Sequence, residues 1–194
     1  MSLSDWQVVN IALEQIAAQT QITSLSDGSP AANAAEAVYA PTVQLLLREL
    51  DPDFSRKTAA LALSGVVTPI LPWSYEYVYP ADCLRMRQVR PPANGYDPND
   101  PQPVRWNVAY EAAGSSRKVV LANQVNALGV YTTSSVTEAQ WDAVFTDAVA
   151  RRLANPLAMA LSGRPDFARE ILEESARVAQ TAEMVDESAV RRLG

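Results

Sequence analysis

Three pairs of carboxylate side chains are the residues of this chain best suited to acid-base chemistry. They are Asp51 with Asp53, Asp97 with Asp100, and Glu173 with Glu174. Two carboxyl groups held in one cleft can serve as acid and base in glycoside hydrolysis. The first two pairs lie beside prolines, where aspartate forms local turn hydrogen bonds, and the third falls on the expected solvent face of a helix. We therefore interpret all three pairs as structural.

Histidine is missing from the sequence, and cysteine occurs once, as Cys83. This composition excludes serine and cysteine nucleophiles that histidine activates, and it excludes metal sites with histidine ligands. A single cysteine cannot form an internal disulfide, so we interpret Cys83 as a small buried residue after a turn. The sequence predicts no enzyme activity, no catalytic residues, no metal site and no cofactor.

A tyrosine row followed by three arginines forms the second candidate site. Its members are Tyr75, Tyr77, Tyr79, Arg85, Arg87 and Arg90. Aromatic rings beside arginines are typical of proteins that stack bases or sugars. The alternative, which we favour, is a strand whose aromatic face covers the core or a neighbouring subunit.

The charge of the chain limits its partners. Sixteen basic and 22 acidic residues give a formal net charge of −6. Gripping nucleic-acid phosphates takes a concentrated set of basic residues, so this balance disfavours a DNA-binding packaging factor. Residues 1–50 contain one basic residue against five acidic ones, whereas residues 80–120 contain six against four. Fourteen of the basic residues are arginine, which favours bidentate pairing at interfaces, although a GC-rich genome gives the same bias.

An extended segment must position the tyrosines and arginines, because residues 73–89 alternate with period 2. In the second half of this segment we expect one face to contain Leu84, Met86 and Gln88. The opposite face is expected to contain Arg85, Arg87 and Val89. A loop at 91–103 follows with five prolines, and residues 104–122 have the pattern of a hairpin. The sequence thus predicts an antiparallel β insert at 73–135 with three to five short strands.

Helical periodicity flanks this insert. We expect two N-terminal helices, from Ser4 to about Ala18 and from Pro30 to about Leu50. Because of Pro41, the second is expected to be kinked near Val38 or to consist of two helices that meet there. Two C-terminal helices are expected at about 137–161 and 165–185, and residues 54–63 are expected to add a short helical turn. Capping boxes are expected at two of the helix starts, formed by Ser4 with Gln7 and by Thr137 with Gln140.

The predicted fold class is α+β, with a four-helix bundle-like frame at residues 1–72 and 136–194 around the antiparallel insert. No apolar run approaches the ~20 residues of a membrane helix. The N-terminus lacks the basic and apolar regions of a secretory signal. We expect a protein made in the cytoplasm, without a membrane segment.

Four sequence blocks, in this order, resemble the head-to-tail adaptor family of tailed bacteriophages. The blocks are NIALEQIA at 10–17, ITSLSDGSPAANAAEAVYAPTVQLLLREL at 22–50, YEYVYPADCLRMRQV at 75–89 and WDAVFTDAVARRLANPLAMALSG at 141–163. The best-known branch of this family is tail tubular protein A of short-tailed phages. The resemblance extends from about Asn10 to Val185, and its most characteristic parts are YPADCLR, the helix that begins with Trp141, and LSG.

The resemblance implies a structural virion protein at the head-tail junction. Such adaptors form a ring, generally of twelve copies, beneath the portal protein, extend the DNA channel and give the next tail or nozzle protein its attachment surface. The resemblance also implies portal contact through the C-terminal residues Arg191, Arg192 and Leu193. DNA is expected to pass through the channel during ejection without specific binding, because an acidic wall repels phosphates.

Five residues of the tyrosine and arginine segment are our candidates for an intersubunit or tail interface: Tyr75, Tyr77, Arg85, Arg87 and Arg90. The alternative function, from a different class, is a glycan-hydrolysing tail protein that uses one of the Asp/Glu pairs. Because every pair also has a structural interpretation, the adaptor is the function that the sequence favours.

Overall fold

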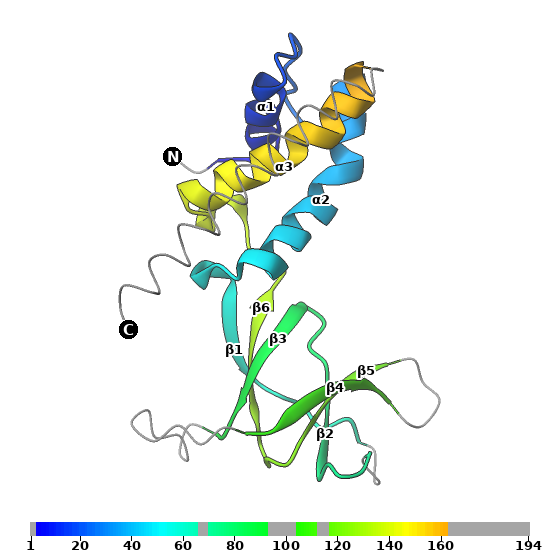
Figure 1. Ribbon diagram of the computed structural model, residues 1–194, viewed down its shortest axis with the longest axis vertical. Helices are drawn as coiled ribbons and strands as arrows, with labels where there is room; N and C mark the ends of the chain where they lie inside the picture. The colour runs from blue at the N-terminus through cyan, green and yellow to red at the C-terminus, as the bar shows by residue number, and fades with distance from the viewer. Residues whose placement is uncertain (1–2, 66–69, 93–103, 112–116, 163–194) are drawn as a thin grey trace, which may run out of the picture. The chain divides into compact units, whose positions relative to one another are not determined.

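The computed structural model describes residues 3–65, 70–92, 104–111 and 117–162 (Figure 1). These residues form three α-helices and six strands in two antiparallel sheets. The fold is mixed α+β, but the expected four-helix bundle frame is wrong. The described chain has three helices, and part of the expected frame is a β-strand. The fourth expected helix, which begins at Pro165, lies outside the described residues.

The chain divides into two compact units, Met1–Leu46 with Thr137–Gly194, and Leu47–Val136. We call the first the helical unit and the second the β unit. The β unit includes residues 47–72, which the sequence analysis placed with the helices. Among the described residues, no helix has the length and apolar character that crossing a membrane requires.

The helical unit contains α1 (Asp5–Gln15), most of α2 (Pro30–Leu50) and α3 (Ala143–Ser162). The predicted capping box of α1 is confirmed, because the Ser4 amide donates to Gln7 Oε1 at 2.8 Å. Helix α1 buries one stripe that contains Val9 and Leu13, and it packs against α3 (Figure 1). Helix α2 continues through Pro41, so the expected split into two helices does not occur.

Helix α3 begins later than predicted. Thr137 and Gln140 do form a capping box, but it caps a single 3₁₀ turn, Glu138–Gln140. The helix starts at Ala143, where Asp142 Oδ1 accepts a hydrogen bond from the Phe145 amide at 2.7 Å. Aspartate is preferred over threonine as an N-cap residue, which explains why α3 is capped by Asp142 and not by Thr137.

The β unit contains two three-stranded sheets. Sheet A has the order β1 (Arg56–Ala60), β6 (Leu128–Thr133), β3 (Cys83–Arg90), and sheet B has the order β2 (Tyr75–Val78), β5 (Lys118–Ala122), β4 (Trp106–Tyr110). All four strand pairings are antiparallel, as predicted. The short helical turn expected within residues 54–63 is limited to a 3₁₀ turn at Asp53–Ser55, and the residues that follow form β1 instead.

One apolar cluster joins the two sheets. Sheet A contributes Met86, Val89 and Tyr131, and sheet B contributes Tyr77 and Val120. Gly129 lies against this cluster, and a Cβ atom placed there would be 2.8 Å from Leu61 Cδ2. The inner faces of the sheets are therefore closely packed, and the opposite face of sheet A is left for polar side chains.

Candidate interaction surface

An irregularity in β3 decides which face its arginines occupy. The pairing register of β3 with β6 shifts between Met86 and Gln88. Met86 and Val89 are both buried in the core, although three positions separate them, so Arg87 and Gln88 lie together on the outer side. The expected alternation, with Val89 on the arginine side and Gln88 opposite, is wrong from Gln88 onward. The bulge places Arg85, Arg87 and Arg90 on one face.

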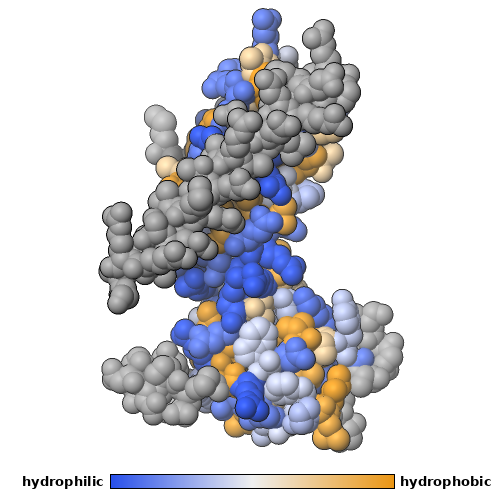
Figure 2. All heavy atoms as spheres, viewed as in Figure 1, coloured by the Kyte–Doolittle hydropathy of each residue, from blue (hydrophilic) through white to orange (hydrophobic). Residues whose placement is uncertain are grey.

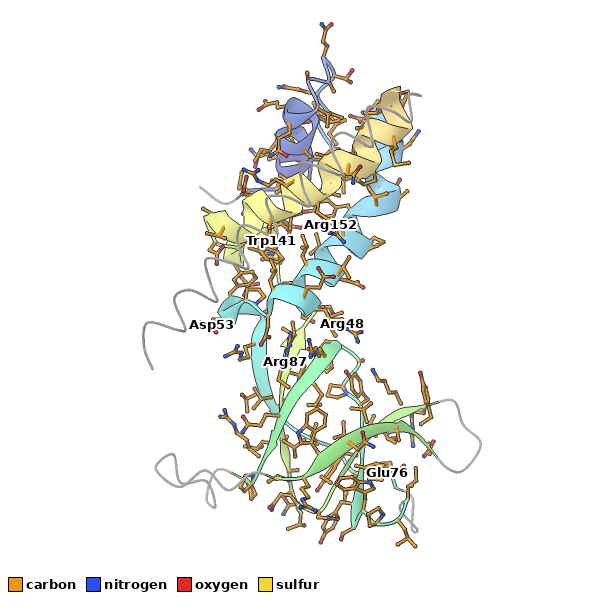
Figure 3. All side chains as sticks on the ribbon, viewed as in Figure 1. Arg48, Asp53, Glu76, Arg87, Trp141 and Arg152 are labelled. Carbon is orange, nitrogen blue, oxygen red and sulfur yellow. The ribbon has the colours of Figure 1, made fainter. Side chains whose placement is uncertain are left out.

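Two further arginines join this face from neighbouring elements. Arg56 of β1 and Arg85 of β3 both pair with Thr132 of β6, so their side chains share the outer face of sheet A, with roughly 10 Å between the two strands. Arg48 lies in the last turn of α2, and its carbonyl oxygen accepts a hydrogen bond from Arg87 at 2.9 Å. Figure 3 shows Arg48 and Arg87 near one another.

We call this surface the arginine face. Its members are Arg48, Arg56, Arg85, Arg87 and Arg90. Figure 2 shows a hydrophilic surface where α2 ends and the strands of sheet A begin. Three of the five residues that the sequence analysis assigned to an interface thus lie together on this face.

Asp51 holds two members of the arginine face in place. Its carboxylate pairs with Arg56 at 3.0 Å and with Arg87 Nε at 3.1 Å, and it accepts a hydrogen bond from Thr132 Oγ1 at 2.8 Å. Asp51 follows α2 in the left-handed backbone conformation, with φ of 47°. The end of the helix is therefore tied to all three strands of sheet A through one carboxylate.

The arginine face contains more positive charge than Asp51 neutralises. Burial lowers the pKa of Arg87, and the charges of Arg85, Arg56 and Arg48 lower it further, while Asp51 opposes them. Within the described residues Arg48 and Arg85 are exposed and have no acidic partner. Arg90 donates from Nε to Gln88 Oε1 at 2.8 Å. This surface can accept carboxylate or phosphate oxygens from a partner.

The tyrosine row lies in β2 of sheet B and at the residue that follows it, and it packs toward the core between the sheets. Tyr77 has no exposed surface, and Tyr75 and Tyr79 pack against the same core cluster. The Tyr77 hydroxyl donates to the Gln124 carbonyl oxygen, and the Lys118 ammonium lies 4.0 Å from the centre of the Tyr79 ring. The row is therefore not a stacking platform, and the buried Tyr77 cannot touch a partner.

A second carboxylate, Asp82, fixes the start of β3. It accepts hydrogen bonds from Lys57 Nζ at 2.7 Å, Thr133 Oγ1 at 2.8 Å and Tyr131 Oη at 3.0 Å. The Lys57 hydrogen bond is the main reason that the pKa of Asp82 falls to about 2. These contacts join β1, β6 and the turn before β3, so Asp82 has a structural role.

Replacing Asp82 with asparagine is expected to lower the free energy of unfolding by about 2 kcal/mol at neutral pH, because charge-assisted hydrogen bonds are lost. The folded-state pKa of Asp82, about 2, lies below its ordinary value of 3.8, so this stabilisation is complete above the ordinary value and disappears as the pH falls through about 2. Urea denaturation of both proteins at decreasing pH checks this. If the difference in stability between the two proteins stayed constant as the pH fell through about 2, the prediction would be contradicted.

The carboxylate pairs show no acid-base machinery where the structure describes them. The oxygens of Asp51 are bound by two arginines and a threonine, and Asp53 is almost fully exposed and 3.3 Å from Arg56. The described residues contain no group of three or more potential metal ligands. The pairs Asp97/Asp100 and Glu173/Glu174 lie outside the described residues, as do Arg191, Arg192 and Leu193.

Glu76 is a residue that the sequence analysis missed. Its side chain is buried, and neither carboxylate oxygen has a hydrogen-bond partner among the residues that the structure describes. It lies opposite Leu121 on the face of sheet B away from the tyrosines. Leu121 and Val119 on that face are buried as well.

Replacing Glu76 with glutamine is expected to raise the free energy of unfolding by about 1 kcal/mol or more at neutral pH, because burying a neutral amide costs less than burying a carboxylate without a hydrogen-bond partner. Urea denaturation measures the change. The matched control is Glu49→Gln, an exposed glutamate in the last turn of α2, which is expected to change stability by less than about 0.5 kcal/mol. A loss of stability in Glu76→Gln would show that the charge has a partner.

The comparisons with known proteins add no assignment to this surface. No protein-family model matches the sequence, and no curated protein matches it significantly.

Proposed function

We propose that this chain is a structural protein of a bacteriophage virion, a head-to-tail adaptor. In this proposal it forms a ring beneath the portal at the head-tail junction, extends the DNA channel and provides the attachment surface for the tail or nozzle protein. It performs no catalysis and needs no cofactor. The ring has twelve copies, to match the portal.

The observation that carries the proposal is the arginine face. The fold fixes Arg56 and Arg87 through Asp51, and it leaves Arg48 and Arg85 exposed and without an acidic partner in the described part of the chain. Arginine is enriched at protein interfaces, where its planar group pairs with carboxylates. Two of these arginines, Arg85 and Arg87, belong to the block at residues 75–89 that resembles the adaptor family, and Arg90 follows that block directly.

The charge of the chain supports a conduit for DNA. A net charge of −6 disfavours tight phosphate binding, so DNA passes through such a ring without being held. In the assembled ring acidic residues outnumber basic ones on the inner wall. The arginine face is turned toward a protein partner and not toward the channel.

Portal binding by the full chain tests the proposal. We expect the chain to co-sediment with the portal protein encoded near its gene, and the double variant Arg191→Ala/Arg192→Ala to weaken this binding about tenfold or more. The control is Arg151→Ala/Arg152→Ala, which removes two arginines from exposed positions of α3 and is expected to leave binding unchanged. A chain that binds no portal, or a gene neighbourhood of metabolic enzymes, would overturn the proposal.

A further inference from the structure

The two units of this chain carry opposite net charge. The described residues of the helical unit include seven acidic and two basic side chains, a net charge of −5. Those of the β unit include six acidic and nine basic side chains, a net charge of +3. Such a division favours contact between unlike units when two copies meet and disfavours contact between like units.

Acidic side chains of the helical unit are available to a partner. Its two basic residues in the described chain are Arg151, which pairs with Asp147 at 2.7 Å, and the exposed Arg152. Glu14 at the end of α1 and Glu36 in α2 are exposed, and within the described part of the chain neither has a basic partner. These carboxylates are desolvated only if another molecule covers them.

The arginine face is prepared to receive carboxylates. Asp51 already orients Arg56 and Arg87, so these side chains lose little conformational entropy when a partner binds. The exposed Arg48 and Arg85 lie close enough to Arg87 for their charges to repel it. A bound carboxylate relieves this repulsion.

We propose that the arginine face of one copy docks the acidic helical unit of a second copy, with Arg48 and Arg85 as the exposed anchors and with exposed carboxylates of the helical unit, Glu14 and Glu36 among them, as their partners. Two different surfaces meet in this contact, so it is heterologous. A heterologous contact that repeats with a closing rotation produces a ring. The inference rests on the ring assembly proposed above and names the contact that would build it.

Sedimentation velocity of the full chain tests this contact. At low ionic strength the wild-type chain is expected to self-associate, and added salt is expected to weaken the association, because the contact joins exposed charges. The reversals Arg48→Glu/Arg85→Glu and Glu14→Lys/Glu36→Lys are each expected to raise the dissociation constant about tenfold or more, and an equimolar mixture of the two variants is expected to associate again.

The control for Arg85→Glu is Arg105→Glu, the same reversal at an exposed arginine outside the arginine face, which is expected to leave association unchanged. A wild-type chain that stays monomeric at low salt, or a mixture that does not associate, overturns the inference. It is also overturned if Arg48→Glu/Arg85→Glu loses binding to a DNA duplex while self-association is unchanged, because the face would then bind phosphates.

The two proposals can fail separately. If the reversed variants still form rings on the portal, the docking contact is wrong and the adaptor function stands. If self-association follows the charges but no portal is bound, the contact stands and the adaptor function fails.

Discussion

Replacing Tyr77 with alanine is expected to lower the free energy of unfolding of the β unit by about 4 kcal/mol. Tyr77 has no exposed surface and packs between the two sheets, against residues such as Met86 and Tyr131. Alanine would leave a cavity at the centre of this cluster and would abandon the hydrogen bond from the hydroxyl to the Gln124 carbonyl oxygen. Urea denaturation followed by circular dichroism measures the loss.

Two variants separate the contributions of the Tyr77 ring and hydroxyl. Tyr77→Phe keeps the ring and is expected to cost about 1 kcal/mol. Tyr110→Ala removes a tyrosine that is 66% exposed on β4 and is expected to change stability by less than about 0.5 kcal/mol. If Tyr77→Ala cost no more than Tyr110→Ala, the tyrosine row would face solvent and would return as a candidate stacking surface.

Replacing Asp51 with asparagine is expected to lower the free energy of unfolding by about 3 kcal/mol, because it leaves partly buried cations without their carboxylate. Arg87 loses the charge that offsets its burial, and Arg56 keeps only the exposed Asp53 as an acidic partner among the described residues. Asparagine has one acceptor oxygen in place of two, so it cannot accept all the hydrogen bonds that Asp51 accepts. The same variant should also weaken self-association, because the arginine face is no longer held in one arrangement. Urea denaturation and sedimentation velocity measure the two effects.

Asp53→Asn is the matched control for Asp51. Its side chain is 94% exposed and pairs only with Arg56 among the described residues, so we expect a change below about 0.5 kcal/mol. Equal losses in the two variants would contradict the role of Asp51 in joining the three strands of sheet A. Any glycan cleavage that Asp51→Asn abolished in a folded protein would instead favour the enzymatic alternative.

Local signals predicted the parts of the fold that depend on neighbouring residues. The capping box of Ser4 and Gln7, the start of α2 at Pro30 after Ser29, and the antiparallel pairing of hairpin strands all follow from short stretches of sequence. Strand β1 could not be found in this way. Its sequence, RKTAA, is mostly exposed and has no alternation, so its structure comes from pairing with the distant β6.

The candidate site was predictable only in part for the same reason. The sequence grouped Arg85, Arg87 and Arg90, but the bulge that brings them to one face depends on the register with β6. Arg48 and Arg56 are far from this group in the sequence, and only the fold adds them. The burial of Glu76 could not be predicted, because an alternating pattern does not show that residues on both faces of sheet B are buried.

The central claim is that the chain forms an adaptor ring beneath the portal, and electron cryomicroscopy of the chain bound to its portal protein tests it most directly. The account predicts a ring of twelve copies with a mainly acidic inner wall and with the arginine face against a neighbouring copy. A complex without a ring, or a ring in which Arg85, Arg87 and Arg90 all line the channel, would contradict it.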